Sequence, residues 1–251
     1  PNPGWSVTCI DGMGRTSTAP LPPRMLRSIH ALTVSARDTI HVTEHFPNAV
    51  VTTGCDTASS VEDWPFPPPT AGLSQEDVVT LGPRDVAWTE RRSDTEPEGP
   101  EPSVWATSRE TECIAPQMCR ALKLSGAGVS AEQPQIAAAR LGTFVLWRER
   151  RDNMWSVAAR HMNTDSAIWT GPVPVSGPRT LVQSPMLASF IRIGAVSAWL
   201  ESDQNDDTKF RVVSRRFHQT WEEAPFVSTS FASPGIAPAV AASASGASIV
   251  A

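Results

Sequence analysis

Short apolar runs alternate with polar clusters along this chain, and neighbouring runs form pairs. The run GTFVLWRE, which begins at Gly142, and the run WSVAARHM, which begins at Trp155, flank the polar cluster RRDN. The run GAVSAWLE from Gly194 and the run FRVVSRRF from Phe210 flank SDQNDD in the same way. Short runs bounded by turn residues are typical of strands, and polar clusters between two such runs are typical of hairpin turns. The pattern therefore predicts an all-β protein.

Both hairpins belong to an internal repeat. A glycine and two tryptophans recur 52 positions later in the chain, so that Gly142, Trp147 and Trp169 match Gly194, Trp199 and Trp221. Weaker copies place Trp88 and Val42 at the position of Trp147, which gives anchors at 42, 88, 147 and 199. Each unit holds four short strands in roughly fifty residues, which is typical of a propeller blade. A solenoid of small sheets is the rival fold.

We expect a single β-propeller domain over residues 1–251, with five blades of four short antiparallel strands. The expected units are 23–70, 71–120, 126–177, 178–229, and 230–251 completed by 1–20. The opening phrase WSVTCID matches the third strand of a unit, and the last residues of the chain match the first two. Pairing of the N- and C-terminal strands would close the propeller and remove two exposed sheet edges. A fragment of a longer propeller would start and stop in the same way.

A glutamate, a tryptophan and an arginine recur at fixed places in the unit. The glutamate stands two residues after each anchor, at Glu44, Glu90, Glu149 and Glu201, and three of the anchors are Trp88, Trp147 and Trp199. Residues two apart on a strand point to the same side. The arginine lies in the third strand, at Arg109, Arg160 and Arg215. Pairing across the RRDN turn places Glu149 near Ser156 and Arg160 near Val145, so a Glu–Arg ion pair within one hairpin is not expected.

These ten residues are the predicted ligand-binding set, one shallow site per blade. An aromatic face suits a sugar ring, and a carboxylate accepts hydrogen bonds from its hydroxyls. The alternative is structural: the tryptophans pack between blades, and the glutamates cap the backbone or form ion pairs between blades. A second set of tryptophans, Trp64, Trp169 and Trp221, is expected to hold the outer strand.

The repeat resembles the Trp-anchored repeats of exported bacterial β-propeller proteins, a group that includes propeller lectins. The resemblance covers most of residues 23–251 and rests on the AW or LW anchors, the SR or AR of the third strand, and the later tryptophan. It implies a secreted, cell-surface or periplasmic protein that binds glycans or glycoproteins through repeated sites, where tethering can raise avidity by ~10²–10⁴. Fucose-binding propeller lectins use Arg, Glu and Trp in each site, but the order of these residues differs here. The aspartate box of sialidases is absent from the sequence.

Two other function classes stay open. A propeller glycoside hydrolase would need unlike carboxylates near the axis, for which Asp38, Asp56 and Asp85 are candidates, although turn positions are the commoner role of aspartate. A protein-interaction scaffold would need no polar ring at all. His41, His45 and His161 show no ligand spacing, so we expect no metal and no cofactor.

The charge, the longest apolar run and the cysteines indicate which kinds of partner and which compartment to expect. The net charge of −5 is spread along the chain, which argues against nucleic acid as a partner. The longest weakly apolar run has 17 residues, mostly Ala and Ser, and is too short and polar for membrane insertion. The four cysteines are Cys9, Cys55, Cys113 and Cys119, and the start without Met favours a processed, exported chain. We expect a disulfide between Cys113 and Cys119, which lie where that unit lacks its outer-strand tryptophan.

Overall fold

A computed structural model describes most of the strands and part of the loops. The described residues are 6–10, 16–20, 29–34, 39–44, 49–54, 60–63, 73–82, 85–92, 101–107, 121–139, 142–163, 166, 168–190, 194–203, 206, 208–232, 237–242 and 248–250. No helix in these ranges is long and apolar enough to cross a membrane.

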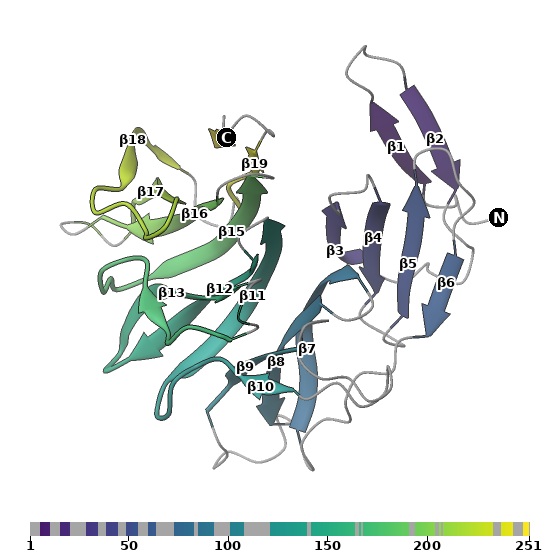
Figure 1. Ribbon diagram of the computed structural model, residues 1–251. Coiled ribbons are helices and arrows are strands. Elements are labelled where there is room, and N and C mark those ends of the chain that lie inside the picture. Colours follow the sequence, from purple (N-terminus) through teal and green to yellow (C-terminus); the bar gives the residue numbers. More distant parts are fainter. Residues whose placement is uncertain are drawn as a thin grey trace.

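Four sheets of four antiparallel strands make up the body of the protein, and each is a meander in which consecutive strands pair (Figure 1). Blade 1 contains β3 (Ile29–Val34), β4 (Thr39–Glu44), β5 (Ala49–Gly54) and β6 (Ser60–Asp63). Blade 2 contains β7 (Leu73–Gly82), β8 (Asp85–Arg92), β9 (Ser103–Thr107) and β10 (Leu122–Lys123). Blade 3 contains β11 (Ser130–Ala139), β12 (Gly142–Arg151), β13 (Met154–Asn163) and β14 (Val173–Pro174). Blade 4 contains β15 (Val182–Phe190), β16 (Gly194–Ser202), β17 (Phe210–Phe217) and β18 (Phe226–Ala232).

The first strands of successive sheets lie next to one another. β3 contacts β7, β7 contacts β11, β11 contacts β15, and β15 contacts β19 (Val240–Ala242). The first strand of each blade is therefore the inner one, and the last strand lies outside, which is the arrangement of propeller blades. The predicted all-β fold with four-stranded antiparallel blades is confirmed.

The two ends of the chain form separate hairpins in the described residues. β1 (Ser6–Ile10) pairs with β2 (Thr16–Pro20), and β19 pairs with β20 (Ser248–Val250). β1 and β20 belong to different two-stranded sheets, which lie on opposite sides of the view in Figure 1. The predicted closure through these strands is not found among the described strands, and the blade count of five is not confirmed.

The hairpin register of blade 3 is the one predicted. Glu149 pairs with Ser156 and Val145 with Arg160 across the β12–β13 turn. The turn residues Asp152 and Asn153 have φ values of 51° and 63°, which are the left-handed values that a two-residue hairpin loop requires. Asp and Asn tolerate this conformation better than other non-glycine residues, which is why a polar cluster stands here.

Steric crowding explains the repeated glycine at the start of β12 and β16. A Cβ at Gly142 would lie 1.6 Å from the carbonyl oxygen of Met162, and a Cβ at Gly194 would lie 1.7 Å from that of Phe217. Only glycine lets the second and third strands approach this closely at that point. The repeat therefore keeps these glycines for backbone contact within each blade.

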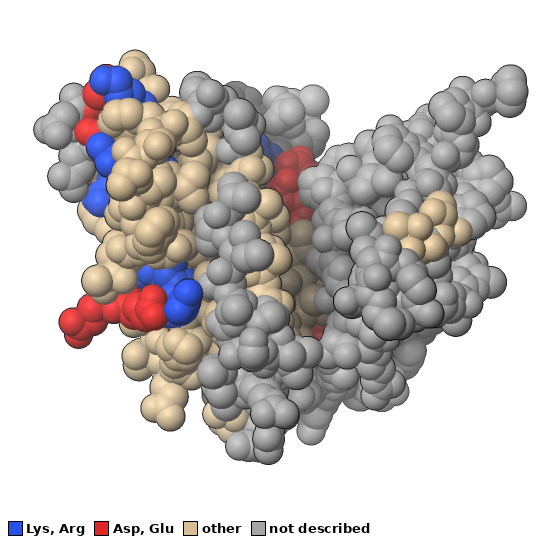
Figure 2. All heavy atoms as spheres, turned by 90° about the horizontal axis from the view of Figure 1, so that it is seen from above, with Lys and Arg blue, Asp and Glu red and all other residues tan. Residues whose placement is uncertain are grey.

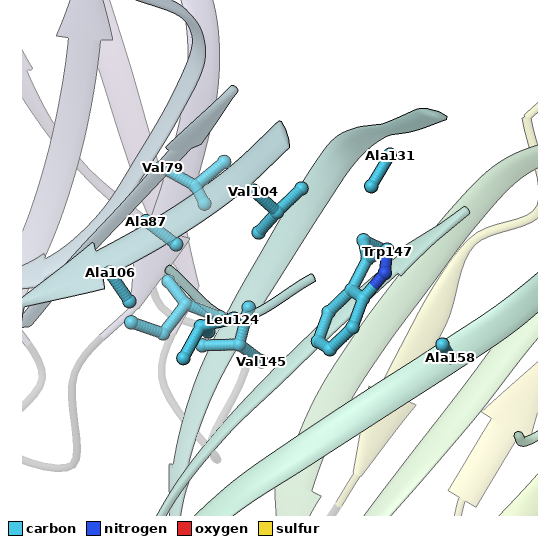
Figure 3. Close-up of a cluster of buried hydrophobic side chains, with 10 residues drawn as sticks. Val79, Ala87, Val104, Ala106, Leu124, Ala131, Val145, Trp147 and Ala158 are labelled. Atoms are coloured by element: carbon cyan, nitrogen blue, oxygen red, sulfur yellow. The ribbon is translucent and has the colours of Figure 1, made fainter. Parts of the chain in front are cut away.

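The second strands of blades 3 and 4 are buried on both faces. Trp147 lies at 0% exposure in a cluster that combines side chains of blades 2 and 3 (Figure 3). Trp199, at 1% exposure, packs in the same way against side chains of blade 3. The run from Gly142 to Trp147 is buried at every position, because its odd and even residues face different blades. Burial on both sides accounts for the continuously apolar strands in the sequence.

A β-bulge lies opposite each buried anchor tryptophan, and the sequence did not predict it. The pairing of β7 with β8 shifts between Glu76 and Val79, and the same shift occurs in β11 and β15. The first bulged residue is left-handed in all three strands, with φ values of 50° at Asp77, 56° at Gln133 and 49° at Ser184. An extra residue at this place bends the inner strand and increases its twist.

Candidate functional site

Three of the four recurring glutamates accept a hydrogen bond from the tryptophan two residues before them. The indole Nε1–H donors and carboxylate acceptors are Trp88 and Glu90 at 3.4 Å, Trp147 and Glu149 at 3.1 Å, and Trp199 and Glu201 at 3.0 Å. Because the two residues point to the same side of the strand, the carboxylate reaches the indole without leaving the sheet. A buried indole N–H needs such a partner, since an unpaired buried donor costs about 1–3 kcal/mol. The spacing of the repeat therefore has a structural cause.

The anchor tryptophans offer no face to a ligand. Trp88, Trp147 and Trp199 are 1%, 0% and 1% exposed. The rings of Trp147 and Trp199 fill the space between blades, and the ring of Trp88 packs against side chains of blade 2. The prediction that these three rings stack on a sugar is therefore corrected: they belong to the core.

The three glutamates differ in what surrounds the rest of the carboxylate. Glu90 and Glu201 are buried, at 4% and 9% exposure. Arg179 donates from Nε to Oε1 of Glu201 at 3.1 Å, while Trp199 takes Oε2, so both oxygens of Glu201 are bonded. Glu149 is half-buried, and Trp147 is its one hydrogen-bond partner within the described ranges. One carboxylate oxygen of Glu149, Oε1, therefore has no hydrogen-bond partner among the described residues.

Glu149 faces a hollow of about 580 Å³ on blade 3. The hollow lies over the outer ends of β12 and β13, beside their turn and β14. Its polar lining among the described residues is Glu149, Arg151, Asp152, Ser156 and Ser176, and its apolar lining is Met154, Ala158, Pro172, Val173, Pro174 and Pro178. Met154 is 38% exposed, Pro174 is exposed as well, and the register places both on the face of the sheet that carries Glu149, so apolar surface is open to solvent beside the carboxylate.

Ser176 lines the hollow, but its hydroxyl already forms hydrogen bonds within the protein. Its Oγ accepts a hydrogen bond from Val157 N at 2.7 Å and donates one to Gly177 O at 3.0 Å. Ser125 and Ser228 accept in the same way from the third strands of blades 2 and 4. The repeated serine therefore satisfies the third strand where the outer strand ends.

The third-strand arginines do not join the glutamates. Arg160 pairs with Val145, four positions along β12 from Glu149, which is about 13 Å at the rise of a strand. Arg215 pairs with Ser197, four positions from Glu201. The Nε atoms of both arginines are buried without a hydrogen-bond partner, and burial lowers the pKa of Arg160. The structure thus separates the residues that the prediction grouped into one site.

Several predicted residues lie outside the described ranges. They are Arg109, Trp64, Asp38, Asp56, Cys55, Cys113, Cys119 and His45, and the side chains of Glu44, Cys9 and His41 are not described either. The disulfide between Cys113 and Cys119 stays a prediction. Asp85 is described and is 3% exposed, at the start of β8, where its carbonyl oxygen accepts from Thr80 Oγ1 at 3.2 Å. Asp85 is thus buried beside the β7–β8 turn.

An ion-pair network between blades was missed by sequence reasoning. Glu132 of β11 accepts from Arg91 of blade 2 and from Arg148 of its own blade. Arg148 also donates from Nη1 to Val182 O of blade 4 at 3.1 Å, so these contacts join three blades. The corresponding residue in β15 is Gln183, so no repeat signal marks the position. Figure 2 shows acidic and basic side chains next to one another among the coloured residues of one face, and these residues form no broad patch of one sign.

His161 contributes to packing between blades 3 and 4. Its ring stacks on Phe144 at a centroid distance of 5.6 Å and lies 5.1 Å from Phe217. Burial lowers the pKa of His161 because the charged imidazolium loses hydration. Among the described residues, no group of three His, Cys, Asp or Glu side chains is placed to hold a metal ion.

Comparisons with known proteins give little beyond this geometry. No family model matches the sequence, and no curated protein matches it. The solved structure of a catalytically inactive virginiamycin B lyase from Staphylococcus aureus with quinupristin is similar to this chain, with a TM-score of 0.46 and 14% sequence identity. The match covers 95% of this chain and 67% of the lyase. Nothing about this chain is concluded from a similarity of that size, so the fold rests on the strands and their contacts.

Proposed function

We propose that the protein binds carbohydrate through the hollow on blade 3, as a lectin-like module without catalysis. The observation that carries this proposal is the free carboxylate oxygen of Glu149 beside exposed apolar surface. Glu90 and Glu201, the corresponding glutamates of blades 2 and 4, are buried. We therefore propose one binding site on blade 3 in place of the predicted site on every blade.

The lining has the chemistry that a sugar needs. Carboxylates accept hydrogen bonds from ring hydroxyls, and the hydroxyl of Ser156 both donates and accepts. Met154 and Pro174 offer apolar surface for the C–H face of a pyranose. A volume of about 580 Å³ lies within the range of small-molecule sites.

Glycans or glycoproteins therefore remain the proposed partners, and secretion remains a prediction from the sequence. Multivalent binding through a ring of blades is not part of the proposal. A chain with one site gains avidity only if it assembles or if its partner carries many sugars.

A glycan array tests the proposal with a matched pair of variants. Glu149→Gln removes the charge but keeps an oxygen that can accept from the indole of Trp147. We expect it to weaken glycan binding about tenfold or more, since hydrogen bonds to charged groups contribute about 1.5–3 kcal/mol. Glu201→Gln is the control and should bind as the unmodified chain does. An array on which both variants bind alike, or on which the unmodified chain binds nothing, would remove the function proposed here.

A further inference from the structure

We propose that the hollow on blade 3 takes the protonated amine of an amino sugar, which Glu149 receives through Oε1. This inference rests on the proposed function, because it names the sugar class of the same site. The reason comes from the next blade, in which the corresponding carboxylate already holds a cation of the protein itself.

The two blades present the same carboxylate in the same way. In blade 4 the indole of Trp199 bonds to Oε2 of Glu201, and Arg179 bonds to Oε1. In blade 3 the indole of Trp147 bonds to Oε2 of Glu149, which leaves Oε1 as the atom that corresponds to the arginine acceptor. The tryptophan thus holds one oxygen of each carboxylate. The other oxygen binds Arg179 in blade 4 and has no hydrogen-bond partner among the described residues in blade 3, where Glu149 lines the hollow.

The linkers before the two blades explain why the cation is missing in blade 3. Residues 124–131 and 175–182 are linkers of equal length. Each begins with a residue whose N–H donates to a third-strand carbonyl oxygen, Leu124 to Val104 and Val175 to Val157. Each ends with the residue that pairs with the glutamate, Ala131 with Glu149 and Val182 with Glu201. Arg179 is the fourth residue after Val175, and Gly128 is the fourth residue after Leu124. Gly128 has a φ of +71°, and a Cβ there would meet nothing within 4 Å. This linker therefore supplies no side chain at the position of Arg179, and among the described residues there is open space for one.

The charges around the hollow favour a cation moderately. Glu149 and Asp152 carry −2 and Arg151 carries +1, so the three charged lining residues sum to −1. Arg151 is directed toward the linker, since its Nη2 would lie 4.0 Å from a Cβ at Gly126. The positive charge of Arg151 repels a bound amine electrostatically without contacting it. Removing that charge should therefore strengthen binding of a cation and weaken binding of an anion.

An amino sugar fits these features better than a free cation does. The amine satisfies Oε1 of Glu149, and the ring covers the exposed side chains of Met154 and Pro174 on the same face. A charge-assisted hydrogen bond is about twice as strong as a neutral one, so the amine supplies affinity that a hydroxyl does not.

Titration calorimetry with a glucosamine tetrasaccharide and its fully N-acetylated counterpart tests the inference, at a pH where the amine is protonated. We expect the amine form to bind about tenfold or more tightly than the acetylated form. Glu149→Gln should remove this preference, Arg151→Gln should increase affinity for the amine form, and Glu201→Gln should change neither value. Circular dichroism of each variant checks that it folds.

The outcomes separate this inference from the proposed function. Equal binding of the two sugars, weakened by Glu149→Gln, would overturn the amine and leave the glycan function in place. Weaker binding of the amine form by Arg151→Gln would also overturn it, because the cationic Arg151 would then assist binding instead of repelling the ligand's amine. If neither sugar binds but methylguanidine does, in a manner that needs Glu149, the cation site stands and the glycan function fails. If none of the three binds, both fail.

Discussion

Blades 3 and 4 come from one repeated unit, yet they use the same glutamate differently. Both bury a tryptophan that donates to the carboxylate two residues later. In blade 4 an arginine of the linker occupies the other oxygen, whereas in blade 3 the corresponding linker residue is Gly128. The repeat therefore preserves the buried tryptophan and its hydrogen bond to the glutamate. The linker residue determines whether the second carboxylate oxygen forms an ion pair within the protein or stays accessible.

The largest expected change in stability comes from a residue of the blade 3 core, whereas a residue of the hollow should contribute little. Trp147→Ala leaves a large cavity among side chains of two blades and should cost about 3–5 kcal/mol in the free energy of unfolding. Glu149→Gln keeps the acceptor for the indole and should leave the melting temperature nearly unchanged. Phe226→Ala is the control for loss of an aromatic ring, because Phe226 is 65% exposed. Chemical denaturation of the three variants measures the comparison, and a stable Trp147→Ala protein would contradict the buried anchor.

The repeated glycines offer a second comparison within the blades. Gly142→Ala should destabilise the fold by about 2 kcal/mol or more, because the new Cβ forces the strands apart and the φ of +139° is strained for alanine. Gly171→Ala is the matched control, since a Cβ there meets nothing within 4 Å. Thermal melts of both variants decide the point. Equal melting temperatures would show that the close approach at Met162 can relax.

Arg179→Ala tests the ion pair that closes the carboxylate of blade 4. The pair is partly exposed, with side-chain exposures of 25% for Arg179 and 12% for Glu201, so its loss should cost about 1–3 kcal/mol, less than a fully buried pair. Methylguanidine at millimolar concentration should restore part of the melting temperature by occupying the vacant place. The double variant Arg179→Ala, Glu201→Gln should not be rescued. Rescue of both proteins alike would mean that the effect of methylguanidine is not at this site.

The blades and the register of the β12–β13 hairpin could be predicted from the sequence, because local causes determine them. Gly142 recurs because a Cβ would strike the neighbouring strand, and Trp147 recurs because each blade must fill the same gap. The polar turn at Asp152 and Asn153 then fixes the register of the hairpin, which places Glu149 opposite Ser156. Such residues repeat because every blade meets the same steric demand.

The roles within the site could not be predicted, because spacing alone does not distinguish them. A glutamate two residues after a tryptophan has the same sequence signature whether it caps a buried indole or binds a sugar. The choice depends on Arg179 and Gly128, which lie far from the motif in the sequence and do not repeat. The network through Glu132 and the bulges at Asp77, Gln133 and Ser184 share this property, since they arise between strands and use different residues in each blade.

The smallest expected effect concerns His161, because blade 4 has a different residue, Arg216, at the corresponding position. In blade 3 the pair Phe144–His161 lies among aromatic rings, whereas the corresponding pair in blade 4 is Val196–Arg216, and Arg216 is exposed. Burial lowers the pKa of His161 in the folded protein, so the unfolded chain binds a proton first as the pH falls. The stability that neutral His161 contributes is therefore fully present above its ordinary pKa of 6.5 and is lost as the pH falls through the lowered folded value.

His161→Phe removes this titration while keeping an aromatic ring against Phe144 and Phe217. We expect its melting temperature to fall less steeply with decreasing pH than that of the unmodified chain, in the range below neutrality where carboxylates are still ionised. Thermal melts of the two proteins in a series of buffers measure the difference in slope. Because the ring is half-buried and keeps part of its hydration, the difference should be small beside the effects of Trp147→Ala and Gly142→Ala. Parallel melting curves would mean that His161 is charged or neutral to the same extent in the folded and unfolded chains, and that burial between blades 3 and 4 does not act on it.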